Sequence, residues 1–344
     1  MIKIGIEHEF VFKDRNDTYL DFENSTYSLF QKIVDAFPYI KNDDLLLECK
    51  SLEKFPKRCY VEGFERYDRE GNLLQTLPSG LEIRTLPHSS IDAVIKDFTW
   101  SYRKMKFIAK SYGLSPLLTS THPYKNTVQL KEPMNSKEST LRSEDELALA
   151  LNSMLIHGLQ VNISIPGLSE AELMDRVHKI NYYLAYLIPF GFSSPFHNGK
   201  CFSGLSYRAY FHAKTRSFTN IRKRKGVSVI EFGGFDACGD EKLLKAQLLL
   251  FKGLLLDKTL MQRSEKQNSK EIQHSTLKGL EDPRIKEGAV TVLNAVKEVL
   301  PKETAALEYL KSMLHSNDSY ALKIKKQYEK TGGIVESLSD LYSY

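Results

Sequence analysis

The N-terminal stretch of residues 1–12 constrains the fold more than any other part of the chain. Apolar residues alternate along it, at Ile2, Ile4, Ile6, Phe10 and Phe12. This spacing is typical of a β-strand. Side chains two apart on a strand share a face, so Glu7 and Glu9 lie together opposite the isoleucines, about 7 Å apart. Two such carboxylates repel each other, and covering them is costly unless a cation neutralises them. Two interpretations stay open: a divalent cation site or a solvated strand face.

Composition indicates a soluble globular protein. The 344 residues are 42% hydrophobic and 26% charged, enough to bury a sizeable core. The net charge of +5 permits anionic substrates such as nucleotides but disfavours a nucleic-acid binder. The four cysteines show no CxxC spacing, so we expect reduced, buried thiols in a cytoplasmic protein. No apolar run reaches membrane-spanning length and the N-terminus reads as a strand, which predicts neither a membrane segment nor a signal peptide.

Periodicity predicts a mixture of strands and helices along the whole chain. Strand patterns occur at 60–67, 73–77, 79–85, 114–119, 158–165 and 227–236. Helical patterns occur at 25–37 and 91–112, after capping boxes at 143–146 and 169–172, and from about residue 241 to the end. Trp100 is expected in the core. We expect a mobile or lid-like loop at 125–142 and a single domain spanning 1–344. The basic run at 222–225 is expected in a solvated loop, and the alternative is that it attracts ATP or an acidic partner.

The polar faces of these strands share one chemistry. They carry Glu7, Glu9, Glu62, Glu82, Arg84, Gln160, Asn162 and Glu231. These are mostly carboxylates and amides, with little of the Lys or Thr that decorates a solvated face. The pattern favours an α+β fold: a curved, mainly antiparallel sheet with helices on its convex side and a site for cations and phosphates on its concave side. An ordinary solvated sheet face is the alternative.

Five motifs in order along the chain carry a resemblance to a known family. They are GIEHEF at 5–10, STHP at 120–123, GLQVN at 158–162, SSPF…G…SYR between 193 and 208, and IEF…D at 230–236. Together with the helix pair at 321–338, they resemble the glutamate–cysteine ligase and carboxylate–amine ligase family, whose fold is similar to that of glutamine synthetase. The resemblance spans roughly residues 1–340.

The resemblance implies ATP- and Mg²⁺-dependent joining of a carboxylate to an amine through an acyl phosphate. Phosphoryl transfer depends on positioning and charge neutralisation rather than on a protein nucleophile. The implied metal ligands are Glu7, Glu9, Glu82 and Glu231. Arg208 is the implied catalytic clamp for phosphate or carboxylate, with Glu82 and Arg84 as further catalytic residues. The nucleotide contacts are assigned to Gln160, Asn162, Ser206 and Arg208.

Two departures from the family pattern concern the substrates. His8 stands where a third glutamate is frequent, and Gly233 stands where an arginine is common. Glutamate and cysteine are the default substrates. The alternatives are the same chemistry with another amine, a peptide or a carrier protein as acceptor, or a catalytically silent binding homologue. His122 could orient a substrate or could serve as a turn residue.

Overall fold

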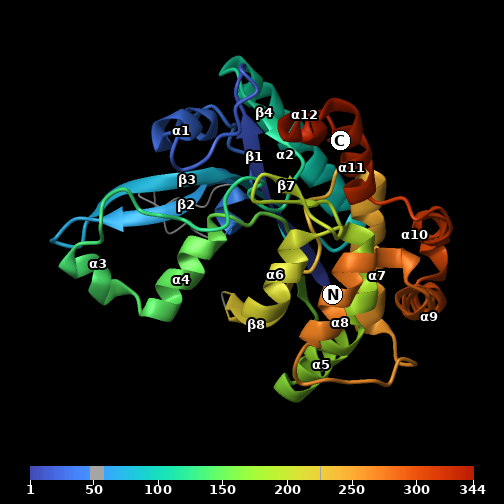
Figure 1. The fold of residues 1–344 in the computed structure, drawn as a ribbon. Helices are drawn as coiled ribbons and strands as arrows, with labels where there is room; N and C mark the ends of the chain where they lie inside the picture. The colour runs from blue at the N-terminus through green and yellow to red at the C-terminus, as the bar shows by residue number, and fades with distance from the viewer. Residues whose placement is uncertain (47–57, 225) are drawn as a thin grey trace.

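The computed structural model describes residues 1–46, 58–224 and 226–344, so Cys49 and Lys225 lie outside the described residues. Their central feature is a seven-stranded antiparallel sheet in the order β2-β3-β1-β5-β9-β8, with β4 paired to β1 (Figure 1). Its strands are β1 (Lys3–Lys13), β2 (Cys59–Tyr67), β3 (Leu73–Arg84), β4 (Ser115–Leu117), β5 (Leu159–Ser164), β8 (Thr219–Arg224) and β9 (Val227–Phe232). A separate two-stranded ribbon joins β6 (Phe196–His197) to β7 (Lys200–Cys201).

The helices divide into an N-terminal set interleaved with the strands and a C-terminal set. The first set is α1 (Tyr27–Asp35), α2 (Ile91–Ser111), α3 (Ser136–Leu141), α4 (Glu144–Ser153), α5 (Glu170–Leu187) and α6 (Tyr207–Thr215). The second is α7 (Glu241–Leu256), α8 (Ser269–Lys278), α9 (Pro283–Val299), α10 (Thr304–Ser316), α11 (Tyr320–Thr331) and α12 (Ile334–Leu338). Ser143 and Ser169 form the two predicted capping boxes that begin α4 and α5.

The core lies against the face of the sheet that carries the alternating apolar residues. Phe10 of β1 lies 6.2 Å from the Phe98 ring and 5.5 Å from the Tyr102 ring, both on α2. On the neighbouring strand β9, Phe232 stacks on Phe251 of α7, with ring centroids 4.4 Å apart. Helices therefore cover one face of the sheet, and its polar side chains are left to the other face.

Strand β3 corrects one expectation. Residues 73–77 and 79–85 were predicted as separate strands, but Leu73–Arg84 is continuous. Gly80 explains the continuity, because a Cβ there would lie 2.1 Å from the carbonyl oxygen of Phe10 on β1. Only glycine lets the two backbones approach this closely without a break in the strand.

Three further expectations are wrong. Arg222 and its neighbours lie in the edge strand β8 rather than in a loop, because exposed charges suit a strand with one open edge. Residues 125–142 are not a free lid: Arg66 of β2 binds the Glu138 carboxylate (2.6 Å) and the carbonyl oxygens of Glu132 and Pro133. Trp100 is 39% exposed instead of buried in the core.

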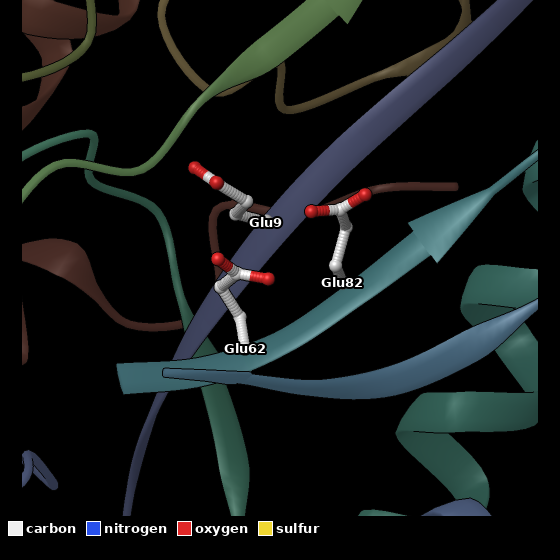
Figure 2. A group of neighbouring side chains, drawn as sticks. All are labelled: Glu9, Glu62 and Glu82. Carbon is white, nitrogen blue, oxygen red and sulfur yellow. The ribbon is translucent and has the colours of Figure 1, made fainter. Parts of the chain in front are cut away.

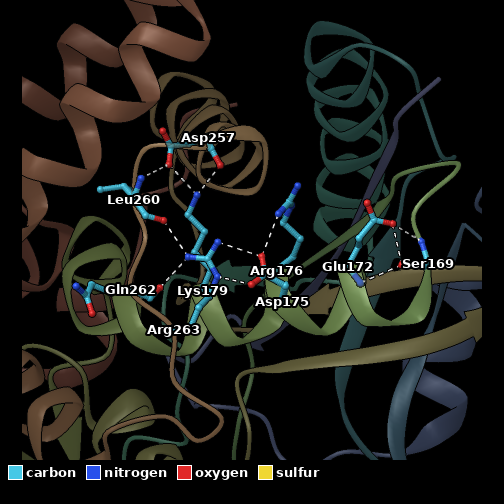
Figure 3. Close-up of polar contacts among 9 residues, drawn as sticks. All are labelled: Ser169, Glu172, Asp175, Arg176, Lys179, Asp257, Leu260, Gln262 and Arg263. Atoms are coloured by element: carbon cyan, nitrogen blue, oxygen red, sulfur yellow. Dashed lines mark hydrogen bonds and ion pairs between the residues drawn. The ribbon is translucent and has the colours of Figure 1, made fainter.

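Helix α5 is fastened to the segment after α7 by a polar network (Figure 3). Lys179 and Asp257 form an ion pair at 2.7 Å, and both side chains are fully buried. Closer to the surface, Arg263 binds both carboxylate oxygens of Asp175. Within the described ranges, no helix has the length and apolar character needed to cross a membrane.

Candidate active site

The register of the sheet gathers the polar side chains that the sequence singled out. Glu7 of β1 lies opposite Arg84 on β3 and Gln160 on β5. Directly opposed residues in antiparallel strands point to the same face, and so do residues two apart in one strand. The pairs Glu9–Glu82 and Asn162–Glu231 extend the same face across four strands. The seven strand residues that were assigned to the site from the sequence therefore share one side of the sheet.

Three carboxylates make the tightest group on this face. Glu9, Glu62 and Glu82 each offer an oxygen within 4.8 Å of the others, from strands β1, β2 and β3 (Figure 2). Figure 2 shows the three side chains as neighbours on the same side of the strands. The sequence places Glu62 on a polar strand face, but it is not among the four predicted metal ligands. Tyr60 of β2 lies opposite Glu82, and Glu62 is two residues after Tyr60. Because residues two apart on a strand share a face, the alternation along β2 could have placed Glu62 beside Glu82.

Electrostatics in this group favour a bound cation. Burial, followed by repulsion from Glu82, raises the pKa of Glu62 to about 8. Burial and Glu82 likewise raise the pKa of Glu7 to about 8. The pKa of Glu9 is raised well above its ordinary value by burial and then by Glu62. Carboxylate oxygens are the donors that Mg²⁺ prefers, and its charge would remove the mutual repulsion. The donor set therefore fits a hard divalent cation.

The remaining predicted ligands lie around this group. Gln160 Nε2 and Asn162 Nδ2 each donate to a Glu7 oxygen at 3.3 Å. Glu231 faces the Arg222 guanidinium at 3.6 Å. The two amide groups therefore bind Glu7 and help to position its carboxylate.

Arg208 is held rigidly beside the carboxylates. It is 5% exposed and donates to the carbonyl oxygens of Gly233 (2.8 Å) and Phe235 (3.1 Å), and it lies 3.5 Å from Asp236. Its Nε is buried without a partner among the described residues. A Cβ on Gly158 would lie 3.0 Å from this guanidinium, so glycine makes room for it. The arginine lines the cavity with one N–H still unpaired.

Ser206 lies behind Arg208 rather than in the cavity. Its hydroxyl caps α6 by accepting from the Ala209 N–H (3.0 Å) and donates to Asp236 (3.1 Å). It is fully buried and is absent from the lining of the cavities described below. The geometry gives Ser206 a role in fixing the start of α6 and with it the position of Arg208.

Arg84 faces the other end of the polar surface. Its Nε donates to Glu82 (3.1 Å), its Nη2 donates to the Tyr60 hydroxyl (2.6 Å), and its guanidinium stacks on the Tyr60 ring at 4.2 Å. These contacts orient Glu82.

Two hollows meet at Glu7. The larger, about 450 Å³, contains the carboxylates together with Arg208, His212 and Arg216, and α4 contributes Leu149 and Ser153 to its lining. Helices α4 and α6 thus complete the site, to which only Arg208 and Ser206 had been assigned from outside the sheet on the basis of the sequence. The smaller, about 300 Å³, is lined by Arg84, Asn162 and apolar side chains that include Leu45, Leu46, Pro87, Val227 and Val229.

Two histidines from the sequence motifs have structural positions. His8 lies on the covered face of the sheet, fully buried and stacked on Phe10 at 4.3 Å, and its Nε2 accepts from the Cys238 N–H. His122 pairs with Asp21 at 2.9 Å and accepts two backbone N–H groups through Nδ1. His122 is therefore a turn residue, the second of its two sequence interpretations.

A curled antiparallel sheet with carboxylates on its open face defines the carboxylate–amine ligase class, and solved structures share the fold. A bifunctional glutathione synthetase from Pasteurella multocida aligns with a TM-score of 0.63 at 12% identity, covering 99% of this chain and 51% of that one. A glutamate–cysteine ligase from Francisella tularensis, solved with AMP, gives 0.62 at 14% identity, covering 99% and 87%. The ligase PafA, solved with the protein Pup, gives 0.54 at 13% identity, covering 98% and 72%.

The chain belongs to glutamate-cysteine ligase family 2, whose profile matches residues 3–221. Two proteins named "Putative glutamate–cysteine ligase 2" are similar in sequence. The one from Rhodospirillum rubrum is 32% identical over 111 residues, covering 32% of this chain and 27% of that protein. The one from Ruegeria pomeroyi is 27% identical over 142 residues, covering 41% and 36%. The matches thus span about a third or less of the length of these relatives. The family and fold expected from the motifs are confirmed.

Proposed function

We propose that this chain joins a carboxylate to an amine at the expense of ATP. The observation that carries the proposal is one cavity of about 450 Å³ that brings the cluster of Glu9, Glu62 and Glu82 together with Arg208 and Arg216. Phosphoryl transfer needs this combination, because anionic phosphates must be held beside both cations and metal-binding carboxylates.

The carboxylates would hold Mg²⁺, with Glu9, Glu62 and Glu82 as its nearest ligands and Glu7 and Glu231 at the margin. Bound there, the cation would neutralise the phosphate oxygens and align the γ-phosphoryl group for attack. Arg84 would keep Glu82 oriented, since it already binds that carboxylate at 3.1 Å.

The smaller hollow suits the base of the nucleotide. Its lining of Leu45, Leu46, Pro87, Val227 and Val229 is apolar, as a flat heterocycle requires, and it adjoins Glu7. The phosphates would then extend over Glu7 toward the carboxylate cluster. The complex of the Francisella tularensis ligase with AMP supports an adenine nucleotide. Charged substrates would occupy the larger, more polar cavity.

In the first step, an oxygen of the substrate carboxylate attacks the γ-phosphorus of ATP and ADP departs, which gives an acyl phosphate. In the second step, the amine attacks the acyl carbon, inorganic phosphate departs and the amine loses a proton. Arg208 would stabilise the oxygens of the transferred group through its unpaired Nε, because the carbonyl oxygens of Gly233 and Phe235 fix its orientation.

Glutamate and cysteine are the default substrates. A different amine, a peptide or a carrier protein is the alternative acceptor, and the PafA–Pup complex lends support to a protein acceptor on this fold. A silent binding homologue is disfavoured, because a protein without the chemistry gains nothing from partly buried, mutually repelling carboxylates.

ADP release tests the proposal. The purified chain is supplied with ATP, Mg²⁺ and a panel of amino acids, singly and in pairs, and the condensation product is identified by mass spectrometry. Turnover that needs both a carboxylate and an amine is expected. ATP hydrolysis that ignores the panel, or no hydrolysis with any pair, would contradict the proposal.

A further inference from the structure

One face of α6 forms a basic wall of the larger cavity. Arg208 and His212 are four residues apart and therefore lie on the same side of the helix. Arg216, at the C-terminal end of α6, continues this wall. Of the three residues, Arg208 alone belongs to a motif of the family resemblance, so no motif pointed to Arg216.

Arg216 is oriented by α4. Its Nη2 donates to the Leu149 carbonyl oxygen at 2.7 Å and to the Ser153 hydroxyl. Within the described residues, its Nε and Nη1 have no hydrogen-bond partner. Burial lowers the pKa of Arg216, and the charge of Glu9 offsets part of this effect, which indicates that the guanidinium lies within electrostatic reach of the carboxylate cluster.

Two further nitrogen atoms on this wall lack hydrogen-bond partners among the described residues. His212 is 7% exposed, and its Nε2 is buried without a partner in the part of the chain that the structure describes. Burial and the charges of Arg208 and Arg216 lower the pKa of His212, so its imidazole is neutral. The Nε of Arg208 is unpaired as well. Unsatisfied buried donors are costly, and a ligand with acceptor oxygens would satisfy them.

We propose that Arg216 is a specificity-determining residue that binds a carboxylate of the substrate away from the reacting atoms. The inference rests on the proposed function and goes beyond it by naming a recognition contact. A guanidinium fixed on one side by α4 and open on the other suits an anionic group with two oxygens. The carboxylate could belong to the carboxylate donor or to the amine acceptor.

The two sources have different consequences for the acceptor. If the carboxylate belongs to the acceptor, the acceptor is a small amine that also carries a carboxylate, such as an amino acid, because a lysine side chain within a protein has no carboxylate beside its amine. If it belongs to the donor, the donor carries two carboxylates, one that reacts and one that Arg216 holds.

The test compares substrates with and without the carboxylate in the full chain. Wild type, Arg216→Gln and Arg216→Lys are assayed by ADP release with L-glutamate or its α-amide as donor, and with L-cysteine or cysteamine as acceptor. Arg216→Gln is expected to lower kcat/KM by about 10- to 100-fold for the carboxylate-bearing member of one pair, as for loss of a charge-assisted hydrogen bond. The analogue without the carboxylate should lose less than about 3-fold, and KM for ATP should stay unchanged. The pair that shows the difference identifies the source.

Two control variants separate recognition from structure. Lys214→Gln removes one positive charge from an exposed position of α6 outside the cavity lining and should leave the kinetics unchanged. Ser153→Ala removes one acceptor that orients Arg216 but keeps the guanidinium, and should cost less than about 3-fold. Equal losses with carboxylate and analogue, or a Ser153→Ala loss as large as that of Arg216→Gln, would overturn the inference in favour of a structural latch.

A binding measurement tests the role of Arg216 independently of whether the chain catalyses the proposed reaction. Calorimetry measures binding of the same four compounds in the presence of Mg²⁺ and ADP, without turnover. Weaker binding of a carboxylate-bearing compound to Arg216→Gln, with its analogue unaffected, supports the inference even if no substrate pair is turned over. Equal binding to wild type and variant, or no binding of any of the four to wild type, overturns it.

Discussion

At the scale of single residues, Glu9 is the carboxylate whose substitution tests the proposed metal site most directly. It lies on β1 opposite Glu82 of β3, and its carboxylate lies within 4.8 Å of both other members of the carboxylate group. Glu9→Gln keeps the shape of the side chain but removes its charge, so the fold should survive while kcat falls about 100-fold or more. Steady-state ADP release with circular dichroism checks this, with exposed Glu70→Gln as the matched control. A Glu9→Gln protein with near wild-type turnover would exclude Glu9 from the metal-binding group.

Lys179 and Asp257 carry the second residue-scale prediction. Both side chains are fully buried, so Lys179→Met leaves an unpaired carboxylate and should destabilise the protein by about 3–5 kcal/mol. The double variant Lys179→Met/Asp257→Asn should recover part of this loss, because it removes the buried charge and the single amide oxygen of asparagine can still accept from the Thr259 N–H and hydroxyl. Asp175→Asn at the more exposed pair with Arg263 should cost about 1 kcal/mol or less. Denaturant unfolding measures all three; a small Lys179→Met effect would contradict the argument.

At the scale of elements, the contact between α3 and β2 should make stability depend on pH. The hydrogen bonds from Arg66 lower the pKa of Glu138 from 4.5 to about 2. A carboxylate with a lowered native pKa stabilises the fold above its unfolded pKa, and that contribution is lost as pH falls from about 4.5 towards 2. Urea midpoints at pH 5, 4 and 3 should therefore fall less steeply for Glu138→Gln than for wild type. Glu329→Gln on α11 should keep the wild-type slope, and identical slopes for all three proteins would refute the assignment.

Elements with strong periodicity were predictable from the sequence, and contacts between distant segments were not. Alternation in β1 and β5 and the capping boxes at Ser143 and Ser169 are local signals, and the structure confirms them. The continuity of β3 depends on how closely Gly80 approaches β1, which no local pattern records. Glu62 and Arg216 enter the cavity through sheet register and helix packing, and neither lies in a motif. Ser206 shows the reverse case, a motif residue whose hydroxyl serves the helix cap.

At the scale of the whole molecule, the carboxylate group opposes folding until a cation binds. Repulsion among Glu9, Glu62 and Glu82 acts in the native state, where they converge, and is weak in the unfolded chain. Glu62→Gln should therefore raise Tm above that of wild type at pH 8 in the presence of EDTA, although it removes a proposed ligand.

Binding of Mg²⁺ and nucleotide should make wild type more stable than Glu62→Gln, the reverse of the order of Tm in EDTA. A non-hydrolysable ATP analogue with Mg²⁺, at about 100 times its Kd, adds about 2.7 kcal/mol to the stability of wild type and should raise its Tm by about 4 °C for a chain of this length. Glu62→Gln should gain much less, because the cation loses one of its three nearest carboxylates. Differential scanning calorimetry of wild type, Glu62→Gln and the control Glu70→Gln, with and without ligand, measures both effects. If Glu62→Gln is less stable than wild type in EDTA, the carboxylates are not in conflict, and the cavity does not require a cation to relieve them.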